Sequence, residues 1–355
     1  MSSTMHGLVL DGIRALRVAD DLPWPVVKHP TDAVVRVHVA GLCGSDLHPW
    51  SGREPFLPGV VAGHEVVGEV TAIGEQVATI CVGDRVIVPF SSSCGVCPPC
   101  RRGLSARCLH GELFGWGAPD GSQLLHGGQA EALRVPHADG TLVVLPDALD
   151  ELLGVLLADN LPTGWFAAQR VGARAGEAAV VLGCGTVGLS TIVALHAHGV
   201  GPVIAVDPVA GRRARAADLG ARACLPDEIA AITAELTGGE GVAGVVDAAG
   251  SSGSFVTAVA LTRPGGTVQV IAVPTHPTLE LAPSAAYDRN LTVRFGRAPV
   301  RSLLPEVIDA VLDGRLRPPT DHVITEAPLA LDAGPAAYIR AADPTDGVGK
   351  LVFRP

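Results

Sequence analysis

One segment constrains the fold of this chain more than any other, because residues 178–207 have the pattern strand, glycine turn, helix and strand. The apolar run AAVVL leads into the turn GCGTVG, the helical stretch LSTIVALHAHG follows, and the segment ends with VIAVD. A GxGxxG sequence alone is a weak signal. Between a strand and a helix, however, it indicates a turn whose glycines let a dinucleotide pyrophosphate approach the helix N-terminus. The residues that we expect to contact this cofactor are Gly183, Gly185, Thr186, Val187 and Gly188.

Asp207 closes the second strand of this segment, nineteen residues after Gly188. A carboxylate at that place accepts hydrogen bonds from the ribose hydroxyls and repels a 2′-phosphate, which favours NAD over NADP. Arg212 follows shortly after Asp207 and is also expected at the cofactor, where its positive charge could accommodate the 2′-phosphate of NADP. Further alternation through GVVDAAG and GGTVQVIAV predicts a doubly wound parallel sheet of α/β class. A sheet protein with glycine turns and no nucleotide remains the alternative.

The rest of the chain has a different character, and 355 residues exceed what one ordinary core holds. The first ~150 residues read as short strands rich in Val and Ile, such as AVVRVHVAGLC and DRVIVPF, bounded by Gly or Asp. From about residue 290 the pattern changes again, and LVFRP reads as a last strand. We therefore expect a β-rich domain and a parallel-sheet domain.

Composition narrows the class of partner. Hydrophobic residues make up 48% and charged residues 17% of the chain, which is typical of a compact globular protein. The net charge of -10 argues against nucleic acid as a partner. Apolar runs are broken before the ~18 residues that a membrane span needs, and the N-terminus lacks the features of a signal peptide. A cytoplasmic location is the expectation.

Half of the eight cysteines lie within fifteen residues, from position 94 to position 108. In a reducing compartment such clustering favours a metal over disulfides. The CxxCxxC turn brings three sulfurs together and a seven-residue spacer lets a fourth complete a tetrahedron, as in a closed structural zinc site. Disulfides, an iron–sulfur cluster or unused thiols are the alternatives. The expected ligands are Cys94, Cys97, Cys100 and Cys108.

A second set of possible ligands lies earlier in the chain, where Cys43 is followed after 21 residues by His64 and then Glu65. The isolated sequence GHE is weak, and it is not the helical HExxH motif because position 68 is Gly. Together with the cysteine lobe, the glycine turn and the ending GKLVFRP, it makes the chain resemble the zinc-containing medium-chain dehydrogenase/reductase family. The segments LHGGQAEALRVPHAD, LADNLPTGW and GRAPVRSLLPEV are most similar to its glutathione-independent formaldehyde dehydrogenase subgroup.

The resemblance implies a role for each residue of this second set. Cys43 and His64 match two ligands of the family's catalytic zinc, and Glu65 matches a carboxylate behind the metal that can approach it. Asp159 occupies the place of the third ligand, as an aspartate does in the subgroup. A helix cap or turn carboxylate is the other interpretation of Asp159. Three protein ligands leave one position open for water or substrate.

The resemblance also implies a proton relay and parts of the pocket. Ser45 matches the hydroxyl that accepts the alcohol's proton, and His48 matches the histidine that passes it to solvent. Thr163 matches a position at the nicotinamide. Further positions with a family counterpart are Phe90 in the substrate pocket, Trp50 beside it or in the core, and Lys350 near the pyrophosphate.

The chain is thus expected to be a zinc-dependent, NAD-linked alcohol dehydrogenase with two zinc ions. Residues 1–153 and 291–355 would form a GroES-like catalytic domain with a zinc lobe at about 91–110, and 154–290 a Rossmann domain. Aldehyde-hydrate oxidation, aldehyde dismutation with retained NAD, and a non-catalytic zinc and dinucleotide-binding protein are the alternatives. The chain is shorter than the formaldehyde-oxidising members, which leaves the alcohol or aldehyde substrate open. A homodimer or homotetramer is implied by the family's edge-to-edge pairing of sheets.

Overall fold

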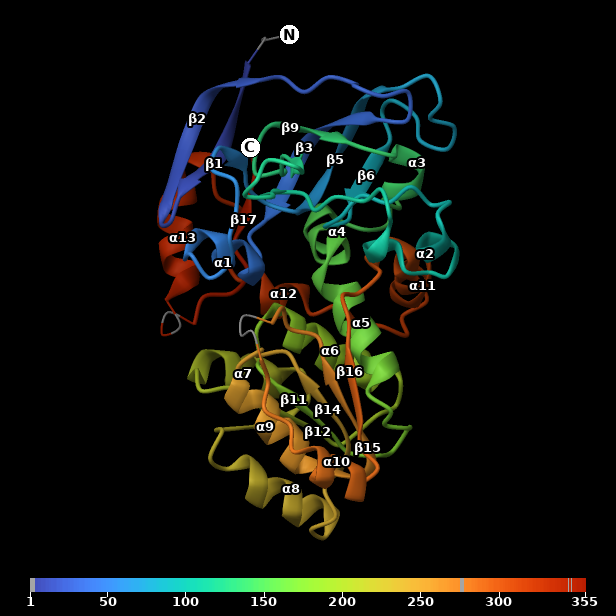
Figure 1. The fold of residues 1–355 in the computed structure, drawn as a ribbon, viewed down its shortest axis with the longest axis vertical. Coiled ribbons are helices and arrows are strands. Elements are labelled where there is room, and N and C mark those ends of the chain that lie inside the picture. Colours follow the sequence, from blue (N-terminus) through green and yellow to red (C-terminus); the bar gives the residue numbers. More distant parts are fainter. Residues whose placement is uncertain (1–3, 275–277, 344, 346) are drawn as a thin grey trace. The chain divides into compact units, whose positions relative to one another are not determined.

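The computed structural model describes residues 4–274, 278–343, 345 and 347–355. The chain groups into two compact units (Figure 1). The first unit comprises Met1–Asp159, Pro299–Ile308 and Ile324–Pro355, and the second comprises Asn160–Ala298 and Asp309–Val323. The segment 291–355, assigned as a whole to the first domain from the sequence, is therefore divided between the units.

Antiparallel strands build the first unit. A sheet of six strands has the order β10-β6-β5-β3-β17, with β9 also paired to β3, and a smaller sheet has the order β2-β1-β4. The buried side chains of Val35, Val66 and Val70 belong to one core cluster of this unit. The strands are β1 (Thr4–Gly12), β2 (Ala15–Pro23), β3 (Ala33–Gly41), β4 (Val60–Val61), β5 (Glu65–Ile73), β6 (Arg85–Val88), β7 (Trp116–Gly117), β8 (Leu124–Leu125), β9 (Ala132–Val135), β10 (Val143–Val144) and β17 (Val352–Phe353).

The register of β3 against β5 positions two loops of the first unit. Gly41, the last residue of β3, pairs with Glu65, the first residue of β5. The residues that leave β3 therefore lie beside those that enter β5, so Cys43 and His64 are brought together although 21 positions separate them. Helix α4 (Glu151–Ala158) contacts both strands, and Asp159 follows it as the C-cap.

The second unit contains one six-stranded sheet in which every pairing is parallel. Its order is β13-β12-β11-β14-β15-β16, so the direction of winding reverses between β11 and β14. Because crossovers between parallel strands are right-handed, this reversal places helices on both faces. The doubly wound parallel sheet predicted from the sequence is confirmed. The strands are β11 (Ala179–Leu182), β12 (Val203–Val206), β13 (Arg222–Cys224), β14 (Val242–Asp247), β15 (Thr262–Val270) and β16 (Thr292–Phe295).

Buried apolar strands explain why this sheet forms. All four residues of β11 and all four of β12 are buried, as expected of strands covered on both faces. Helices α5 and α6 pack closely, since a Cβ on Gly164 would lie 2.5 Å from the backbone carbon of Ser190. The helices of eight residues or more are α4, α5 (Asn160–Arg170), α6 (Thr186–Ala197), α7 (Ala210–Asp218), α8 (Ile229–Thr237), α9 (Ser252–Leu261), α11 (Val300–Leu312) and α13 (Gly334–Ala342). The short ones are α1 (Leu47–Trp50), α2 (Pro98–Arg101), α3 (Ala138–Thr141), α10 (Pro283–Asp288), α12 (Thr320–Val323), η1 (Gly44–Asp46), η2 (Ser105–Arg107) and η3 (Leu331–Ala333).

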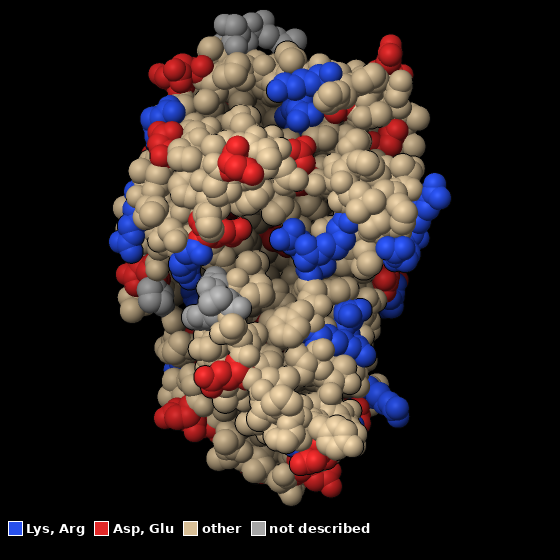
Figure 2. All heavy atoms as spheres, in the orientation of Figure 1, with Lys and Arg blue, Asp and Glu red and all other residues tan. Residues whose placement is uncertain are grey.

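Two further observations concern the surface. Within the described residues, no helix is both long and apolar enough to cross a membrane. Basic and acidic side chains are interspersed on the face that Figure 2 shows. That face therefore does not carry charge of a single sign.

Candidate metal centres and nucleotide site

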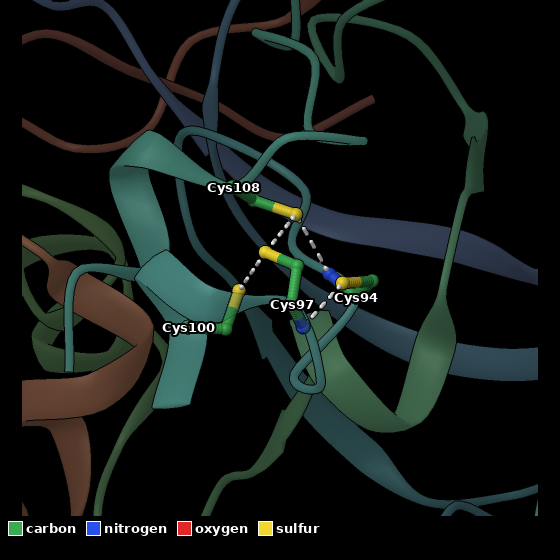
Figure 3. A group of neighbouring side chains, drawn as sticks. All are labelled: Cys94, Cys97, Cys100 and Cys108. Carbon is green, nitrogen blue, oxygen red and sulfur yellow. Dashed lines mark hydrogen bonds between the residues drawn. The ribbon is translucent and has the colours of Figure 1, made fainter. Parts of the chain in front are cut away.

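The four clustered cysteines converge in the first unit (Figure 3). Cys97 is the N-cap of α2, and Cys108 follows η2. The two short helical turns thus bring the sulfurs of these cysteines close together. The Cys97 sulfur lies 3.5 Å from that of Cys100 and 3.8 Å from that of Cys108. Tetrahedral zinc with bonds of about 2.3 Å requires sulfurs about 3.8 Å apart. The geometry therefore fits the predicted structural zinc site.

Electrostatics at the lobe also favour a cation. Backbone N–H groups of Cys94 and His110 donate to the Cys108 sulfur at 3.2 and 3.4 Å. Although desolvation opposes ionisation of Cys97, hydrogen bonds from the Cys100 and Leu109 backbone lower its pKa to about 6. Desolvation and the neighbouring sulfurs raise the pKa of Cys100 to about 12. Four thiolates this close require a positive ion among them.

A second cluster is formed by Cys43, His64, Glu65 and Asp159, whose candidate ligand atoms all lie within 4.8 Å of one another. The Asp159 Oδ2 atom lies 3.7 Å from the Cys43 sulfur and 3.7 Å from His64 Nε2. Ligand pairs around a tetrahedral zinc ion are about 3.4–3.6 Å apart for these bond lengths. One thiol, one imidazole and one carboxylate thus fit a zinc ion, with Glu65 behind them.

Burial and charge set the state of this cluster. Burial, followed by the nearby Glu65 carboxylate, raises the pKa of Cys43. Although burial opposes protonation of His64, the Asp46 and Asp159 carboxylates raise its pKa well above the ordinary value. Several acidic groups therefore face one another in a buried place, which is the arrangement that a divalent cation stabilises.

Two charged partners of the cluster were not predicted from the sequence. Asp46 Oδ1 lies 2.9 Å from His64 Nδ1, and Asp46 Oδ2 accepts the Cys43 N–H at 2.9 Å. Lys350 Nζ forms a buried ion pair with Glu65 and donates to the Leu42 carbonyl at 3.4 Å. Cys43 is the N-cap of η1 and Asp46 is the third residue after it, and this capping-box spacing is the signal that could have identified Asp46. The structure thus places Lys350 against Glu65, whereas the resemblance placed it near a pyrophosphate.

Ser45 and His48 occupy η1 and α1, next to Cys43 in the chain. The Ser45 hydroxyl lies 3.3 Å from His64 Nε2, at the ligand cluster. His48 is partly buried, and burial, followed by the charge of Arg53, lowers its pKa. No hydrogen bond joins Ser45 to His48 among the described residues, so their role in a relay stays a prediction.

The two aromatic residues considered for the substrate pocket, Phe90 and Trp50, have different surroundings in the structure. Phe90 is buried, and its N–H donates to the Ala158 carbonyl at 3.3 Å, which places it beside the end of α4. Trp50 is 4% exposed and packs on Tyr338 with ring centroids 6.1 Å apart. Of the two roles considered for Trp50, the structure favours core packing.

The glycine turn of the second unit joins β11 to α6, as the sequence pattern required. A Cβ on Gly188 would lie 1.8 Å from the Gly183 carbonyl oxygen, so only glycine fits there. Asp207 follows β12, and its carboxylate accepts the N–H groups of Cys184 at 2.9 Å and Val209 at 2.8 Å. This ties the second strand's end to the turn, at the point where the winding of the sheet reverses.

The remaining cofactor candidates lie in the same unit. A guanidinium nitrogen of Arg212 is 4.0 Å from the Asp207 carboxylate. Gly185 is the N-cap of α6, and Thr186 and Val187 begin the helix, so their backbone N–H groups lie at its N-terminus. Thr163 is a buried residue of α5.

Comparisons with known proteins agree with both parts of the chain. The family model for the alcohol dehydrogenase GroES-like domain matches residues 29–147, and that for the zinc-binding dehydrogenase matches residues 186–313. The predicted GroES-like domain is thereby confirmed. A probable zinc-binding alcohol dehydrogenase of Mycobacterium tuberculosis is 39% identical over 337 residues, covering 95% of this chain and 85% of that protein. A glutathione-independent formaldehyde dehydrogenase of Pseudomonas aeruginosa is 30% identical over 90% of each chain.

Solved structures of dehydrogenases also match the fold of this chain. The alcohol dehydrogenase from Thermus sp. ATN1 superposes with a TM-score of 0.91 at 33% sequence identity, over 99% of each chain. A zinc-binding dehydrogenase from Sinorhizobium meliloti, solved with NADP bound, has a TM-score of 0.85 at 26% identity.

Proposed function

Because the chain belongs to the zinc-dependent medium-chain alcohol dehydrogenase family, we propose that Cys43, His64 and Asp159 hold the catalytic zinc ion of an NAD-linked alcohol dehydrogenase. The observation that supports this most is the convergence of these side chains, together with Glu65, within 4.8 Å. The second zinc ion would be held by the four-cysteine lobe, where it stabilises the fold locally.

The metal, the cofactor and the residues around them would have different roles in this reaction. Zinc would supply Lewis acidity at the substrate oxygen, and the nicotinamide would supply the hydride acceptor. Three ligands leave one position open for the substrate. Lys350 holds the Glu65 carboxylate in an ion pair behind this set. Glu65 is therefore an intermittent ligand or a neighbour of the metal, and the permanent third ligand is Asp159.

Ser45 and His48 would remove the alcohol's proton. The Ser45 hydroxyl reaches the ligand cluster, so it would accept the alcohol's proton there while it gives up its own hydroxyl proton. Partial burial lowers the pKa of His48, which keeps its imidazole neutral at pH 7 and able to accept a proton in turn.

The second unit would bind the cofactor and the first would carry the catalytic zinc. The turn from Gly183 to Gly188 and the N-terminus of α6 would receive the pyrophosphate. Asp207 would receive the adenosine ribose and disfavour a 2′-phosphate, with Arg212 beside it. We expect a preference for NAD over NADP. Thr163 would contact the nicotinamide side.

Two further proposals concern the cellular compartment and the oligomeric state of the enzyme. Clustered thiols fit a reducing compartment, which supports the cytoplasm. Strand β16 ends the sheet of the second unit, and pairing of two copies along it would give a homodimer or, with further contacts, a homotetramer.

Metal analysis combined with turnover tests the proposal. The expected result is two zinc ions per chain and NAD-dependent oxidation of members of a panel of primary, secondary and polyol alcohols. Oxidation of one aldehyde molecule coupled to reduction of another, without added NAD, would instead indicate a dismutase with retained cofactor. Binding of zinc and NAD without turnover of any alcohol or aldehyde would indicate a non-catalytic protein.

A further inference from the structure

A chain of buried hydrogen bonds runs from helix α13 towards the proposed catalytic zinc site. Tyr338, on α13, donates its hydroxyl to Gln129 Oε1 at 2.8 Å. The Gln129 Nε2 atom in turn donates to the Gly41 carbonyl at 3.0 Å and faces Asp46 Oδ2 at 3.5 Å. Gln129 is 0% and Tyr338 1% exposed. Neither residue belongs to the ligand set or to the proton relay.

The chemistry of the partners fixes the orientation of the Gln129 amide. The Gly41 carbonyl and the Asp46 carboxylate only accept hydrogen bonds, so the Gln129 nitrogen must face them. The Gln129 oxygen therefore faces Tyr338, which must donate. Each group in the chain has the partner that its chemistry requires, and none can reverse without leaving a buried atom unsatisfied.

Asp46 is the group on which this chain ends. Its two carboxylate oxygens contact His64 Nδ1 and the backbone N–H of Cys43, both at 2.9 Å. A proton on Nδ1 leaves the lone pair of His64 Nε2 directed at the metal position. The orientation of Asp46 thus determines both the tautomer of His64 and the path of the chain at Cys43.

Backbone packing holds Gln129 in place. Its N–H donates to the Ala62 carbonyl at 2.9 Å, and the Gly128 N–H donates to the Gly63 carbonyl at 3.1 Å. Gly63 has φ +88, and a Cβ there would lie 2.4 Å from Gln129 Cγ. The residue before His64 must therefore be glycine for the Gln129 side chain to lie across the peptide that carries the ligand.

We propose that Gln129 and Tyr338 are positioning residues of the catalytic zinc site, which act through Asp46 on His64 and Cys43. This inference rests on the proposed function, because it assumes that those two side chains bind zinc. Tyr338 lies 209 positions from Gln129, so the C-terminal segment of the first unit takes part in shaping a site whose ligands come from residues 43–159.

The test measures zinc affinity at each site by competition with a chromophoric chelator, and the Co²⁺ absorption spectrum at the catalytic site. Gln129→Met removes the amide at similar volume and should weaken zinc binding there by about 10–100-fold. Tyr338→Phe removes one neutral hydrogen bond and should weaken it by about fivefold. Because Tyr338 acts through Gln129, Tyr338→Phe should add nothing in the Gln129→Met background. The four-cysteine site is the internal reference and should keep its affinity.

Gln269→Met is the matched control, since Gln269 is 0% exposed in the second unit and its amide donates to the Val270 carbonyl at 3.1 Å. It should leave zinc affinity at both sites unchanged. If the wild-type protein binds two zinc ions and neither Gln129→Met nor Tyr338→Phe changes the affinity or the Co²⁺ spectrum, the inference is wrong while the proposed function stands. Equal losses at both zinc sites would indicate general destabilisation and also overturn it. If the wild-type protein binds no zinc at Cys43, the proposed function itself fails.

Discussion

The buried ion pair between Lys350 and Glu65 allows a quantitative expectation. The two side chains are 1% and 0% exposed, so neither charge is hydrated. Burial raises the pKa of Glu65, and the Lys350 ammonium acts against that shift. Lys350→Met keeps most of the volume of the side chain and removes the charge. The variant therefore isolates the cost of leaving one buried carboxylate without its cation.

The carboxylate can avoid that cost by taking up a proton, which sets an upper limit. Protonating a glutamate of ordinary pKa 4.5 at pH 7 costs about 3.4 kcal/mol, at about 1.36 kcal/mol per pH unit. This limit lies within the loss of about 3–5 kcal/mol seen when one partner of a buried pair is removed. We expect metal-free Lys350→Met to lose up to about 3 kcal/mol in its free energy of unfolding at pH 7, because burial already raises the pKa of Glu65 in the wild type and part of the cost is shared.

The same reasoning predicts how the loss of unfolding free energy in Lys350→Met depends on pH. In the variant the pKa of Glu65 is higher in the folded than in the unfolded protein, so the folded state binds the extra proton. The deficit relative to the wild type should be nearly absent below the unfolded pKa and grow as pH rises. At pH 5 the same calculation leaves at most about 0.7 kcal/mol.

Urea denaturation of the chelator-treated proteins, followed by tryptophan fluorescence between pH 5 and pH 8, measures this deficit. Lys28→Met is the matched control, because Lys28 is the only other lysine and is exposed. It should change the free energy of unfolding by less than about 0.5 kcal/mol. Glu65→Gln combined with Lys350→Met should recover most of the loss, since no buried charge remains. A Lys350→Met deficit that is absent at pH 7, or that does not shrink towards pH 5, would refute the reasoning.

Three other substitutions test the proposed sites. Cys43→Ala should reduce the zinc content from two ions per chain to one and abolish turnover, and full turnover by a zinc-loaded preparation would contradict the ligand assignment. Cys97→Ser should remove the other ion and lower the thermal midpoint, as measured by metal analysis and calorimetry, whereas unchanged zinc content would argue against the lobe. Asp207→Asn keeps an oxygen to accept the Cys184 N–H but removes the charge, so the ratio of kcat/KM for NADP to that for NAD should rise at least about tenfold. An unchanged ratio would mean that Asp207 does not select the cofactor.

The features that could be predicted from the sequence are those that short segments encode. The glycine turn and Asp207 lie within thirty residues of one another, and the four cysteines within fifteen. In such segments the spacing alone limits where the side chains can lie. Even the adjacency of Cys43 and His64 follows from one strand pairing, β3 with β5.

The partners of the ligands could not be predicted because they come from distant parts of the chain. Lys350 reaches Glu65 across 285 positions, and Tyr338 reaches Gln129 across 209. A single buried lysine, glutamine or tyrosine carries no spacing pattern, and each is as consistent with a surface position as with a buried one. Only the tertiary fold decides which charges are removed from water together. The division of residues 291–355 between the two units has the same origin, because helix α11 begins in one unit and ends in the other.

The spacing in the sequence left the role of Asp159 open between a metal ligand and a helix cap. Asp159 lies between two helices, because it is the C-cap of α4 and directly precedes α5, which begins at Asn160, so its place in the chain alone allows either interpretation. Asp159 also lies 3.7 Å from the Cys43 sulfur, a second group that can become an anion. A carboxylate beside a thiol and a buried glutamate is stabilised by a divalent cation, and this favours the ligand over the cap.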